Sequence, residues 1–255
     1  MRRSLMLAAV AALALSSAGC MAGMGVPSMP DAASYAAALA DPSRPAADRE
    51  RDTARHAAET LAFARVRPGQ QITDMIIGGG YFTRVFAAAV GPQGHVTAWQ
   101  PAEFLGFQAS YRAAADAADA MANVDAIRAP IATPAFPANQ DLFFTAQNYH
   151  DLHLTPFGAG AAARVNAAVF AALKPGGLYV IVDHDAAAGS GLAAPNTLHR
   201  IDIEAVKREV TAAGFVLDGE SALLANPADP RMANVFDASI RGQTSQFMLR
   251  FKKPR

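Results

Sequence analysis

The sequence is poor in cysteine, in charged residues and in long apolar runs. Cys20 is the only cysteine among 255 residues, so no intrachain disulfide can form. Only 17% of the residues are charged, and 22 basic side chains balance 22 acidic ones without runs of like charge. This balance does not favour a nucleic-acid partner. The apolar run Leu5–Leu15 is about half of the ~20 residues that a membrane-spanning helix needs. We therefore expect neither a disulfide scaffold nor a permanent transmembrane helix.

The first residues have the layout of an export signal. Arg2 and Arg3 precede the apolar run, and small residues follow it. The segment "LSSAGC" resembles the lipobox of bacterial lipoproteins, in which the signal is cut before a cysteine that carries lipid. We expect a signal peptide at residues 1–19 and a lipid on Cys20 that holds the protein on the periplasmic side of a bacterial membrane. Cleavage without acylation is the alternative.

Residues 20–45 are rich in alanine, glycine, proline and serine, which predicts a flexible tether with one short helix at Ala32–Ala40. The remaining residues, 46–255, suffice for one domain with a sizeable core. After a first helix over 46–65, apolar strand-like runs alternate with alanine-rich helical segments. The expected strands are Ile72–Ile77, His95–Gln100, Val124–Arg128, Leu142–Gln147 and Leu178–Asp183. The expected helices are Tyr81–Val90, Pro101–Met121, Gly160–Leu173 and Ile203–Ala213.

These strands lack strict alternation, as in "LYVIVD", which is typical of a parallel sheet buried on both faces. The segments "GFVLDGESALL" and "SQFMLRFKK" predict two further strands with no helix between them. The fold class is therefore α/β. We expect a doubly wound, mostly parallel seven-stranded sheet that ends in an antiparallel hairpin.

Three consecutive glycines, Gly78–Gly80, directly follow the first expected strand and precede a helix. Ligands of open α/β sheets bind beyond the carboxyl ends of the strands, and glycine lets them approach the backbone. The helix start favours an anionic group. A dinucleotide fingerprint would need glycine at Thr83 and an acid near Gln100, so NAD is not favoured. A tight turn that needs glycine only for packing is the alternative.

Across residues 46–255 the chain resembles the class I S-adenosylmethionine-dependent methyltransferases. The resemblance is carried by "ITDMIIGGGYFT", "LKPGGLYVIVDH" and the closing hairpin. More narrowly, the chain is similar to predicted bacterial methyltransferases that carry signal peptides. That similarity lies in "RDTARHAAETLAFARVRPG", "AQNYHDLH" and "NTLHRIDIEAVKREVTAAGF".

The resemblance implies S-adenosylmethionine as the cofactor. The cofactor-binding residues that it implies are Asp74, Gly78, Gly79, Gly80, Tyr81, Thr83, Gln100 and Asn148. Three positions depart from the family pattern. Ile76 replaces the first glycine, Gln100 replaces the carboxylate that holds the ribose, and residues 128–130 lack the acid that often meets adenine. Glu103 is either a substitute for Gln100 or a helix cap.

Histidines and carboxylates gather just after the later expected strands. The candidate catalytic residues are His150, Asp151, His153 and His184, and the same region also carries Asp183, Asp185, His199 and Asp202. His150 or His153 could act as a general base near neutral pH, with Asp151 or Asp185 fixing its tautomer. A metal held by His150, His153, His184 and a carboxylate is an alternative, although we assign no metal. Purely structural roles are the other alternative.

Asp52 and His56, four residues apart in the first expected helix, could add to this group from above. The function expected from the sequence is methyl transfer to an unidentified small acceptor by an exported protein. A non-catalytic binding protein on the same fold is the alternative, and a hydrolytic or metal-assisted enzyme is a third possibility. Because S-adenosylmethionine is charged and made in the cytoplasm, an exported enzyme needs a supply of it outside.

Overall fold

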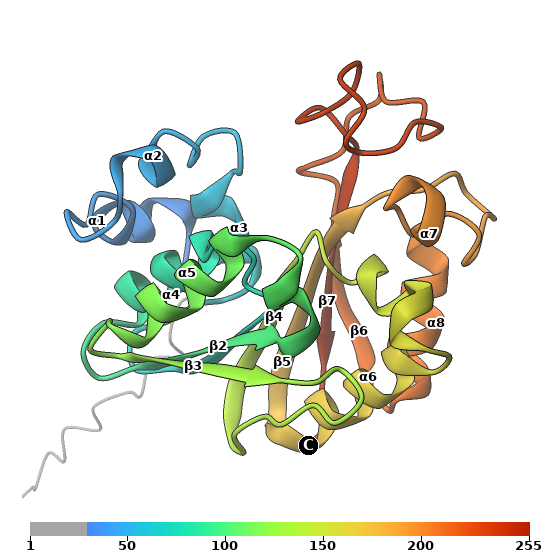
Figure 1. The fold of residues 1–255 in the computed structure, drawn as a ribbon. Helices are drawn as coiled ribbons and strands as arrows, with labels where there is room; N and C mark the ends of the chain where they lie inside the picture. Colours follow the sequence, from blue (N-terminus) through green and yellow to red (C-terminus); the bar gives the residue numbers. More distant parts are fainter. Residues whose placement is uncertain (1–29) are drawn as a thin grey trace, which may run out of the picture.

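The computed structural model describes residues 30–255, which form a seven-stranded sheet in the order β3-β2-β1-β4-β5-β7-β6 (Figure 1). The strands are β1 (Gln71–Met75), β2 (His95–Pro101), β3 (Val124–Ala129), β4 (Gln140–Ala146), β5 (Leu173–His184), β6 (Val216–Ser221) and β7 (Gln246–Lys252). Strands β1 to β5 pair in parallel, and β7 runs antiparallel to both β5 and β6. The expected fold class is confirmed, closing hairpin included.

Helices cover both faces of the sheet (Figure 1). The α-helices are α1 (Ala36–Leu39), α2 (Ala46–Arg49), α3 (Ala57–Phe63), α4 (Tyr81–Val90), α5 (Ala109–Asp119), α6 (Ala161–Ala172), α7 (Pro195–Leu198) and α8 (Ile203–Ala212). The 3-10 helices are η1 (Ala32–Tyr35), η2 (Ala102–Gly106), η3 (His150–His153) and η4 (Thr155–Phe157). Figure 1 shows α3, α4 and α5 on one side and α6 and α8 on the other.

Two hydrophobic clusters fill the space on either side of the sheet. Phe143 and Phe144 are consecutive in β4 and both fully buried, one in each cluster. Phe144 packs against Phe86 of α4, while Phe143 belongs to the cluster that contains Val206 of α8. A central strand with no polar face is what burial on both sides requires, which is why the apolar runs did not alternate.

Two helices that the sequence suggested as continuous are interrupted. The segment 46–65 forms α2 and α3, separated by turns and by the left-handed backbone of His56, whose φ is +45°. Asp52 and His56 therefore do not share one helix face. The segment 101–121 forms η2 and α5, because Gln108 between them is extended. The helical spacing of apolar residues does not reveal such breaks, because the two helices on either side of a break each bury an apolar face.

The described part of the expected tether, residues 30–45, is packed on the domain. Tyr35 is buried, and its hydroxyl donates hydrogen bonds to the carbonyls of Leu61 and Val66. Arg44 is also buried and makes a two-pronged ion pair with Asp52. The tether boundary at residue 45 is thus wrong, because a buried aromatic ring and a buried guanidinium tie this segment down. Residues 1–29, including the expected signal peptide and Cys20, lie outside the described residues.

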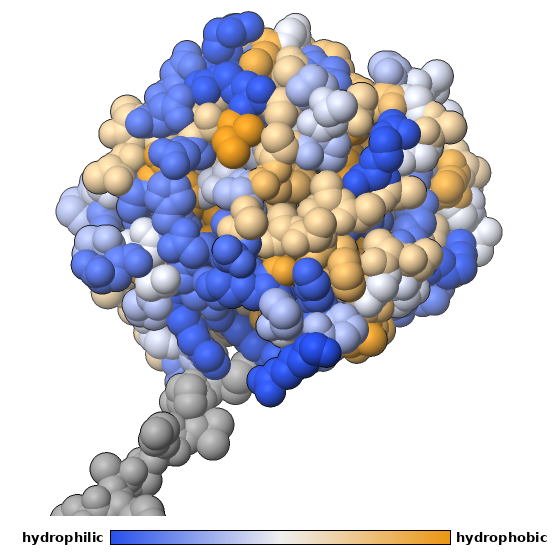
Figure 2. Space-filling view, turned by 90° about the horizontal axis from the view of Figure 1, so that it is seen from below, coloured by the Kyte–Doolittle hydropathy of each residue, from blue (hydrophilic) through white to orange (hydrophobic). Residues whose placement is uncertain are grey.

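No helix within residues 30–255 has the length and apolar character needed to cross a membrane. Figure 2 shows the face seen from below, where the chain ends in Figure 1. Hydrophilic and weakly apolar residues are mixed there, and strongly apolar residues form small separate spots.

Candidate active site

A cleft of about 400 Å³ lies beyond the carboxyl ends of β1, β4 and β5. Because β1 and β4 are neighbours in the sheet and β4 pairs with β5, the loops after these strands meet there. The lining residues from these loops include Ile76, Gly78, Gly79, Asn148, His150, Asp151 and His184. The expected juxtaposition of the glycine loop and the histidines is therefore present in the structure.

The glycine loop leaves open space at the tip of β1. A Cβ added to Gly79 would meet no atom within 4 Å, and one added to Gly78 would meet only Tyr111, at 3.9 Å. Gly80 has a φ of +74° and precedes α4 without capping it by a side chain, and the Thr83 amide in the first turn of the helix hydrogen-bonds to Asp74. The loop is tied to β4 by Asn148, whose amide donates to the Ile76 carbonyl at 2.9 Å.

Ile76 occupies the backbone conformation that glycine favours. Its φ is +62°, which is rare for a residue branched at Cβ. The side chain is buried and lines the cleft. The loop therefore keeps the backbone shape implied by the family pattern, while an isoleucine side chain fills part of the space beside it.

Asp74 and Thr83 form a buried pair beneath the glycine loop. The Thr83 hydroxyl donates to Asp74 at 2.6 Å, and both side chains are buried. Burial raises the pKa of Asp74 to about 7, although the Thr83 hydrogen bond opposes this shift. Asp74 borders the cleft, whereas Thr83 supports it from behind. The pair ties the end of β1 to the first turn of α4.

Gln100 does not line the cleft. It is fully buried, and its Oε1 accepts a hydrogen bond from the Gly78 amide at 3.0 Å. Its side chain thus holds the glycine loop, which corrects the expectation that it faces a ribose. Glu103 does not replace it either, because the Glu103 carboxylate accepts from the Ile131 amide after β3.

Two arginines, Arg51 and Arg55, make one side of the cleft cationic, and they lie over the ring of Tyr81 at the start of α4. The Tyr81 hydroxyl donates to Asp52 at 2.5 Å, and the Tyr81 ring lies 4.6 Å from the Arg55 guanidinium and 5.5 Å from that of Arg51. Both arginines line the cleft. Burial, and then the charge of Arg51, lower the pKa of Arg55. The spacing of these arginines in the sequence does not indicate that they face a cavity.

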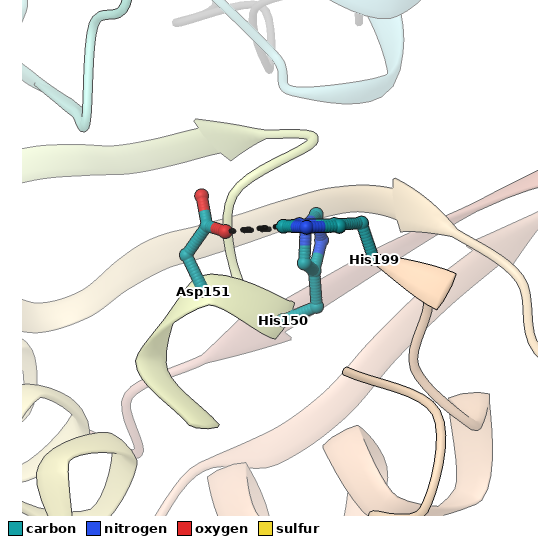
Figure 3. A group of neighbouring side chains, drawn as sticks. All are labelled: His150, Asp151 and His199. Atoms are coloured by element: carbon teal, nitrogen blue, oxygen red, sulfur yellow. Dashed lines mark ion pairs between the residues drawn. The ribbon is translucent and has the colours of Figure 1, made fainter. Parts of the chain in front are cut away.

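A cluster of His150, Asp151 and His199 forms the opposite side of the cleft, and Figure 3 shows Asp151 pointing toward the two imidazoles. Asp151 Oδ1 lies 3.2 Å from His150 Nε2 and 3.8 Å from His199 Nδ1. The other ring nitrogen of His150, Nδ1, lies 2.8 Å from Asp183. His199 was noticed in the sequence only as one of four histidines, because it is distant from "NYHDLH".

The surroundings of His150 argue against its expected role as a base near neutral pH. Burial disfavours the charged ring, but the Asp183 charge and the hydrogen bonds to Asp151 and Asp183 outweigh it and raise the pKa of His150. The ring therefore holds its proton at neutral pH. For Asp151, burial raises the pKa, but the hydrogen bonds to His150 and His199 outweigh it and lower the pKa overall.

The remaining candidates are separated from this cluster. His153 does not line the cleft, and its Nε2 lies 3.1 Å from Glu209 of α8. His184 lines the cleft, but its Nδ1 lies 2.8 Å from the Thr244 hydroxyl, and burial lowers its pKa to about 4. Asp185 pairs with Arg231 and orients no histidine.

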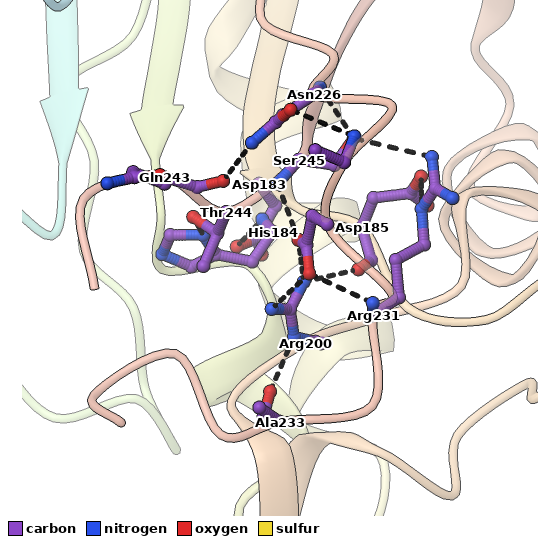
Figure 4. A network of polar contacts seen from close by, with 12 residues as sticks. Asp183, His184, Asp185, Arg200, Asn226, Arg231, Ala233, Gln243, Thr244 and Ser245 are labelled. Carbon is purple, nitrogen blue, oxygen red and sulfur yellow. Dashed lines mark hydrogen bonds and ion pairs between the residues drawn. The ribbon is translucent and has the colours of Figure 1, made fainter. Parts of the chain in front are cut away.

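A polar network holds the segment that carries His199 against the end of β5 (Figure 4). Arg200 is fully buried, donates to the Asp185 carbonyl and forms an ion pair with Asp229 at 2.7 Å. The Ile201 amide donates to the carbonyl of His184. His199 is thus placed by contacts of Arg200 and Ile201 with the end of β5 and with Asp229, and its position does not depend on the short helix α7 alone.

Comparison with known proteins identifies the fold. No family model and no curated protein matches the chain. Among solved structures, the chain is similar to an S-adenosylmethionine-dependent methyltransferase from Aquifex aeolicus, with 17% identity and a TM-score of 0.57 over 87% of this chain and 98% of that one. The fold is that of the class I methyltransferases.

The class I methyltransferase fold also occurs in a protein named for another reaction. The [4+2]-cyclase SpnF is 18% identical, with a TM-score of 0.56 over 82% of this chain and 81% of that one. An arsenic(III) S-adenosylmethionine methyltransferase from Chlamydomonas reinhardtii is 16% identical, with a TM-score of 0.50 over 74% and 65%. At these identities the likeness establishes the fold, and the reaction has to be argued from the site.

Within this class I methyltransferase fold, the implied cofactor residues divide into two layers. Asp74, Gly78, Gly79, Tyr81 and Asn148 line the cleft, whereas Gly80, Thr83 and Gln100 lie behind it. Aromatic side chains that the sequence did not single out complete the wall, and these are Phe104, Phe107, Tyr111 and Phe236. Phe104 lies in η2, Phe107 directly follows it, Tyr111 lies in α5, and Phe236 lies on the loop before β7. The sequence alone does not show that these segments meet at the cleft.

Proposed function

We propose that the chain transfers a methyl group from S-adenosylmethionine to a small acceptor. One observation carries the proposal: the bare backbone at Gly78 and Gly79 shares one cleft with the His150–Asp151–His199 cluster. In this fold the two parts correspond to a place for a cofactor and a place for an acceptor. A cleft of about 400 Å³ is within the range of small-molecule sites.

The residues present fit the cofactor at its methionine end. The positive end of the α4 dipole and the Arg55 guanidinium offer favourable charge for its carboxylate. The open space at Gly79 admits a chain that lies against the backbone. Phe104 and Tyr111 provide aromatic surface on which an adenine ring can pack.

The fit is weaker at the ribose, because Gln100 is occupied by the Gly78 amide and the Glu103 carboxylate by the Ile131 amide. Affinity for the cofactor should therefore be modest. The same departure favours the second candidate, a protein that keeps the fold and binds a related small molecule without catalysis. Binding of S-adenosylmethionine with no methylated product from any acceptor would support that candidate.

When bound, S-adenosylmethionine supplies a methyl group on a positively charged sulfur, which an acceptor attacks in line. The chain itself has to hold the acceptor between Gly79 and the cluster and to accept the proton that the acceptor loses. We assign the proton to the Asp151–His199 side of the cluster, because His150 is enclosed between two carboxylates. Phe107 and Phe236 border the cleft and are exposed, so we propose a partly apolar acceptor with an O–H or N–H group.

The test is calorimetry with S-adenosylmethionine and S-adenosylhomocysteine on the wild type and on Gly79→Val. Gly79 has no positive φ and open space around it, so valine should leave the fold intact and obstruct the ligand. Gly106 has the same properties and does not line the cleft, which makes Gly106→Val the matched control. We expect binding to the wild type and the control, and a loss of at least about tenfold in affinity, or about 1.4 kcal/mol, in Gly79→Val. Absence of binding at about 1 mM would end the methyltransferase proposal.

We further propose that the protein is exported and anchored by a lipid on Cys20. Arg2, Arg3, the apolar run Leu5–Leu15 and "LSSAGC" support this proposal. Labelled palmitate should be incorporated by the wild type and not by Cys20→Ala, which should also leave the membrane fraction. An unlabelled wild-type chain in the soluble fraction would contradict anchoring.

A further inference from the structure

Three side chains at the rim of β4 and β5 bring metal-binding atoms together. His150, Asp151 and His199 each offer one nitrogen or carboxylate oxygen, and these atoms all lie within 4.8 Å of one another. His150 and Asp151 are neighbours in η3, and His199 comes from the end of α7 (Figure 3). All three line the cleft, so a bound ion would face the space where an acceptor enters.

The residue behind His150 completes an arrangement common at metal sites. Asp183 is fully buried and lies 2.8 Å from His150 Nδ1, and it also accepts the backbone amides of His150 and His184. A carboxylate on Nδ1 fixes the ring and directs Nε2 toward Asp151. Ligand histidines are held in this way by a carboxylate on the nitrogen that does not bind the metal.

The charges around the cluster also suit a cation. Asp151 and Asp183 bring two carboxylates to a poorly hydrated place. The nearby arginines are engaged elsewhere, since Arg200 pairs with Asp229 and Arg231 pairs with Asp185. Among the described residues, imidazoles are the ionisable side chains that contact these two carboxylates, and Asp183 also accepts two backbone amides. A divalent ion bound to His150 Nε2 would replace the proton that the ring holds there and would balance the two carboxylates in its place.

We propose that His150 Nε2, Asp151 and His199 bind one divalent transition-metal ion. Two imidazoles and one carboxylate suit zinc, iron, cobalt or nickel better than calcium or magnesium, which prefer oxygen ligands. Ligand atoms around a four-coordinate zinc lie roughly 3.3 Å apart, given bonds of about 2.0 Å. The His150–Asp151 distance of 3.2 Å already matches, and the 3.8 Å between Asp151 and His199 requires a small movement of the His199 ring.

This ligand set differs from the one that the sequence suggested. The spacing in "NYHDLH" pointed to His150 with His153, but His153 pairs with Glu209 outside the cleft. His184 is engaged by Thr244. His153 therefore serves as a control, because it lies on the same 3-10 helix as two proposed ligands.

The consequence for catalysis rests on the proposed function, whereas metal binding does not. With the ion bound, Asp151 and His199 would be its ligands and would no longer accept the proton of the acceptor. An acceptor oxygen or nitrogen bound to the ion would instead lose its proton more readily to water, because the cation stabilises the negative charge that forms. The acceptor would then belong to compounds that can ligate a metal through a hydroxyl or an amine.

The experiment is titration of the chelator-treated full chain with Zn²⁺ by calorimetry and with Co²⁺ by visible absorption, without S-adenosylmethionine. We expect one ion per chain. We expect the affinity for the metal to fall by at least about 100-fold in His199→Ala and in Asp151→Asn, because each variant loses a ligand. In Asp183→Asn, which keeps all three ligands and loses only the carboxylate that orients His150, we expect a fall of about 10-fold to 100-fold. His153→Gln should bind like the wild type.

Two results would overturn the proposal: no binding by the wild type at about 1 mM metal, or His199→Ala binding as tightly as the wild type. Should a ligand variant fail to fold, the Co²⁺ spectrum of the wild type still decides, since mixed nitrogen and oxygen ligands in a low-symmetry site give visible bands stronger than those of aqueous Co²⁺. The metal titration contains no S-adenosylmethionine, so its outcome does not depend on cofactor binding. If the protein binds the metal but fails to bind S-adenosylmethionine in the separate calorimetry, the proposed function is refuted and this inference stands.

Discussion

The backbone of Ile76 is held in a conformation that side chains avoid, and this strain can be measured. Its φ is +62°, and the residue is buried at the tip of β1. Replacing it by alanine or by glycine removes much the same packing, but only glycine relieves the backbone. We expect Ile76→Gly to be more stable than Ile76→Ala by about 1 kcal/mol in urea unfolding.

Ile72 in the same strand provides the matched comparison, because it is fully buried and has ordinary strand geometry. There we expect the reverse order, with the glycine variant less stable than the alanine variant by about 0.5–1 kcal/mol. The same order at both positions would show that Ile76 carries no strain.

Asp74 makes stability depend on pH. Its pKa is about 7 in the folded protein, because burial disfavours the charge, and about 3.9 in an unfolded chain. Between these values the folded protein keeps a proton that the unfolded chain has released. The contribution of Asp74 to the free energy of unfolding should therefore fall as the pH rises from about 4 to about 7, and it should be constant above that range.

Asp74→Asn removes this titration and keeps an acceptor for the Thr83 hydroxyl. Between pH 5 and pH 8 the wild type should lose roughly 2–3 kcal/mol of stability relative to the variant, measured by urea unfolding without ligand. Parallel pH profiles for the two proteins would contradict the raised pKa.

At the scale of elements, the segment between β5 and α8 depends on one buried ion pair. Arg200 and Asp229 have fully buried side chains, 2.7 Å apart. Arg200→Met keeps a long side chain but leaves the carboxylate without its partner. We expect a loss of about 3–5 kcal/mol in the free energy of unfolding, because the uncompensated charge stays buried.

Arg128 is the control for this substitution, since it pairs with Asp116 and Asp119 on the surface. Arg128→Met should lower the free energy of unfolding by less than about 1 kcal/mol. Thermal unfolding measures the loss in both variants. Similar losses in the two variants would mean that the Arg200–Asp229 pair does not hold the segment that carries His199.

At the scale of the whole molecule, the sequence predicts the sheet better than it predicts the site. Short apolar runs bounded by turn residues, such as Leu178–Asp183, indicate buried strands from the local sequence alone. The site depends on partners that come from distant segments. Glu209 draws His153 away from the cleft, whereas the contacts of Arg200 bring His199 to it. No spacing within "NYHDLH" encodes either contact.

The N-terminal segment 30–45 contributes buried contacts to the domain. A chain that begins at residue 46 lacks the Tyr35 hydroxyl, which binds the Val66 carbonyl at 2.7 Å, and lacks Arg44, the partner of Asp52. Compared with a chain that begins at residue 30, we expect its melting temperature to be lower by roughly 10 °C, because several kcal/mol of burial and pairing are lost. Thermal unfolding of both chains measures the difference.

Tyr35→Phe in the longer chain is the control, since it removes one buried hydroxyl and should cost only about 1 kcal/mol. Asp52 also accepts from Tyr81, beside the Arg55 side of the cleft, so the shorter chain should bind an anionic ligand less tightly as well. Equal melting temperatures would mean that the packing of residues 30–45 adds nothing to the stability of the domain. A lower melting temperature of the shorter chain, together with weaker binding of an anionic ligand, would mean that residues 30–45 help to hold the wall of the proposed active site in place.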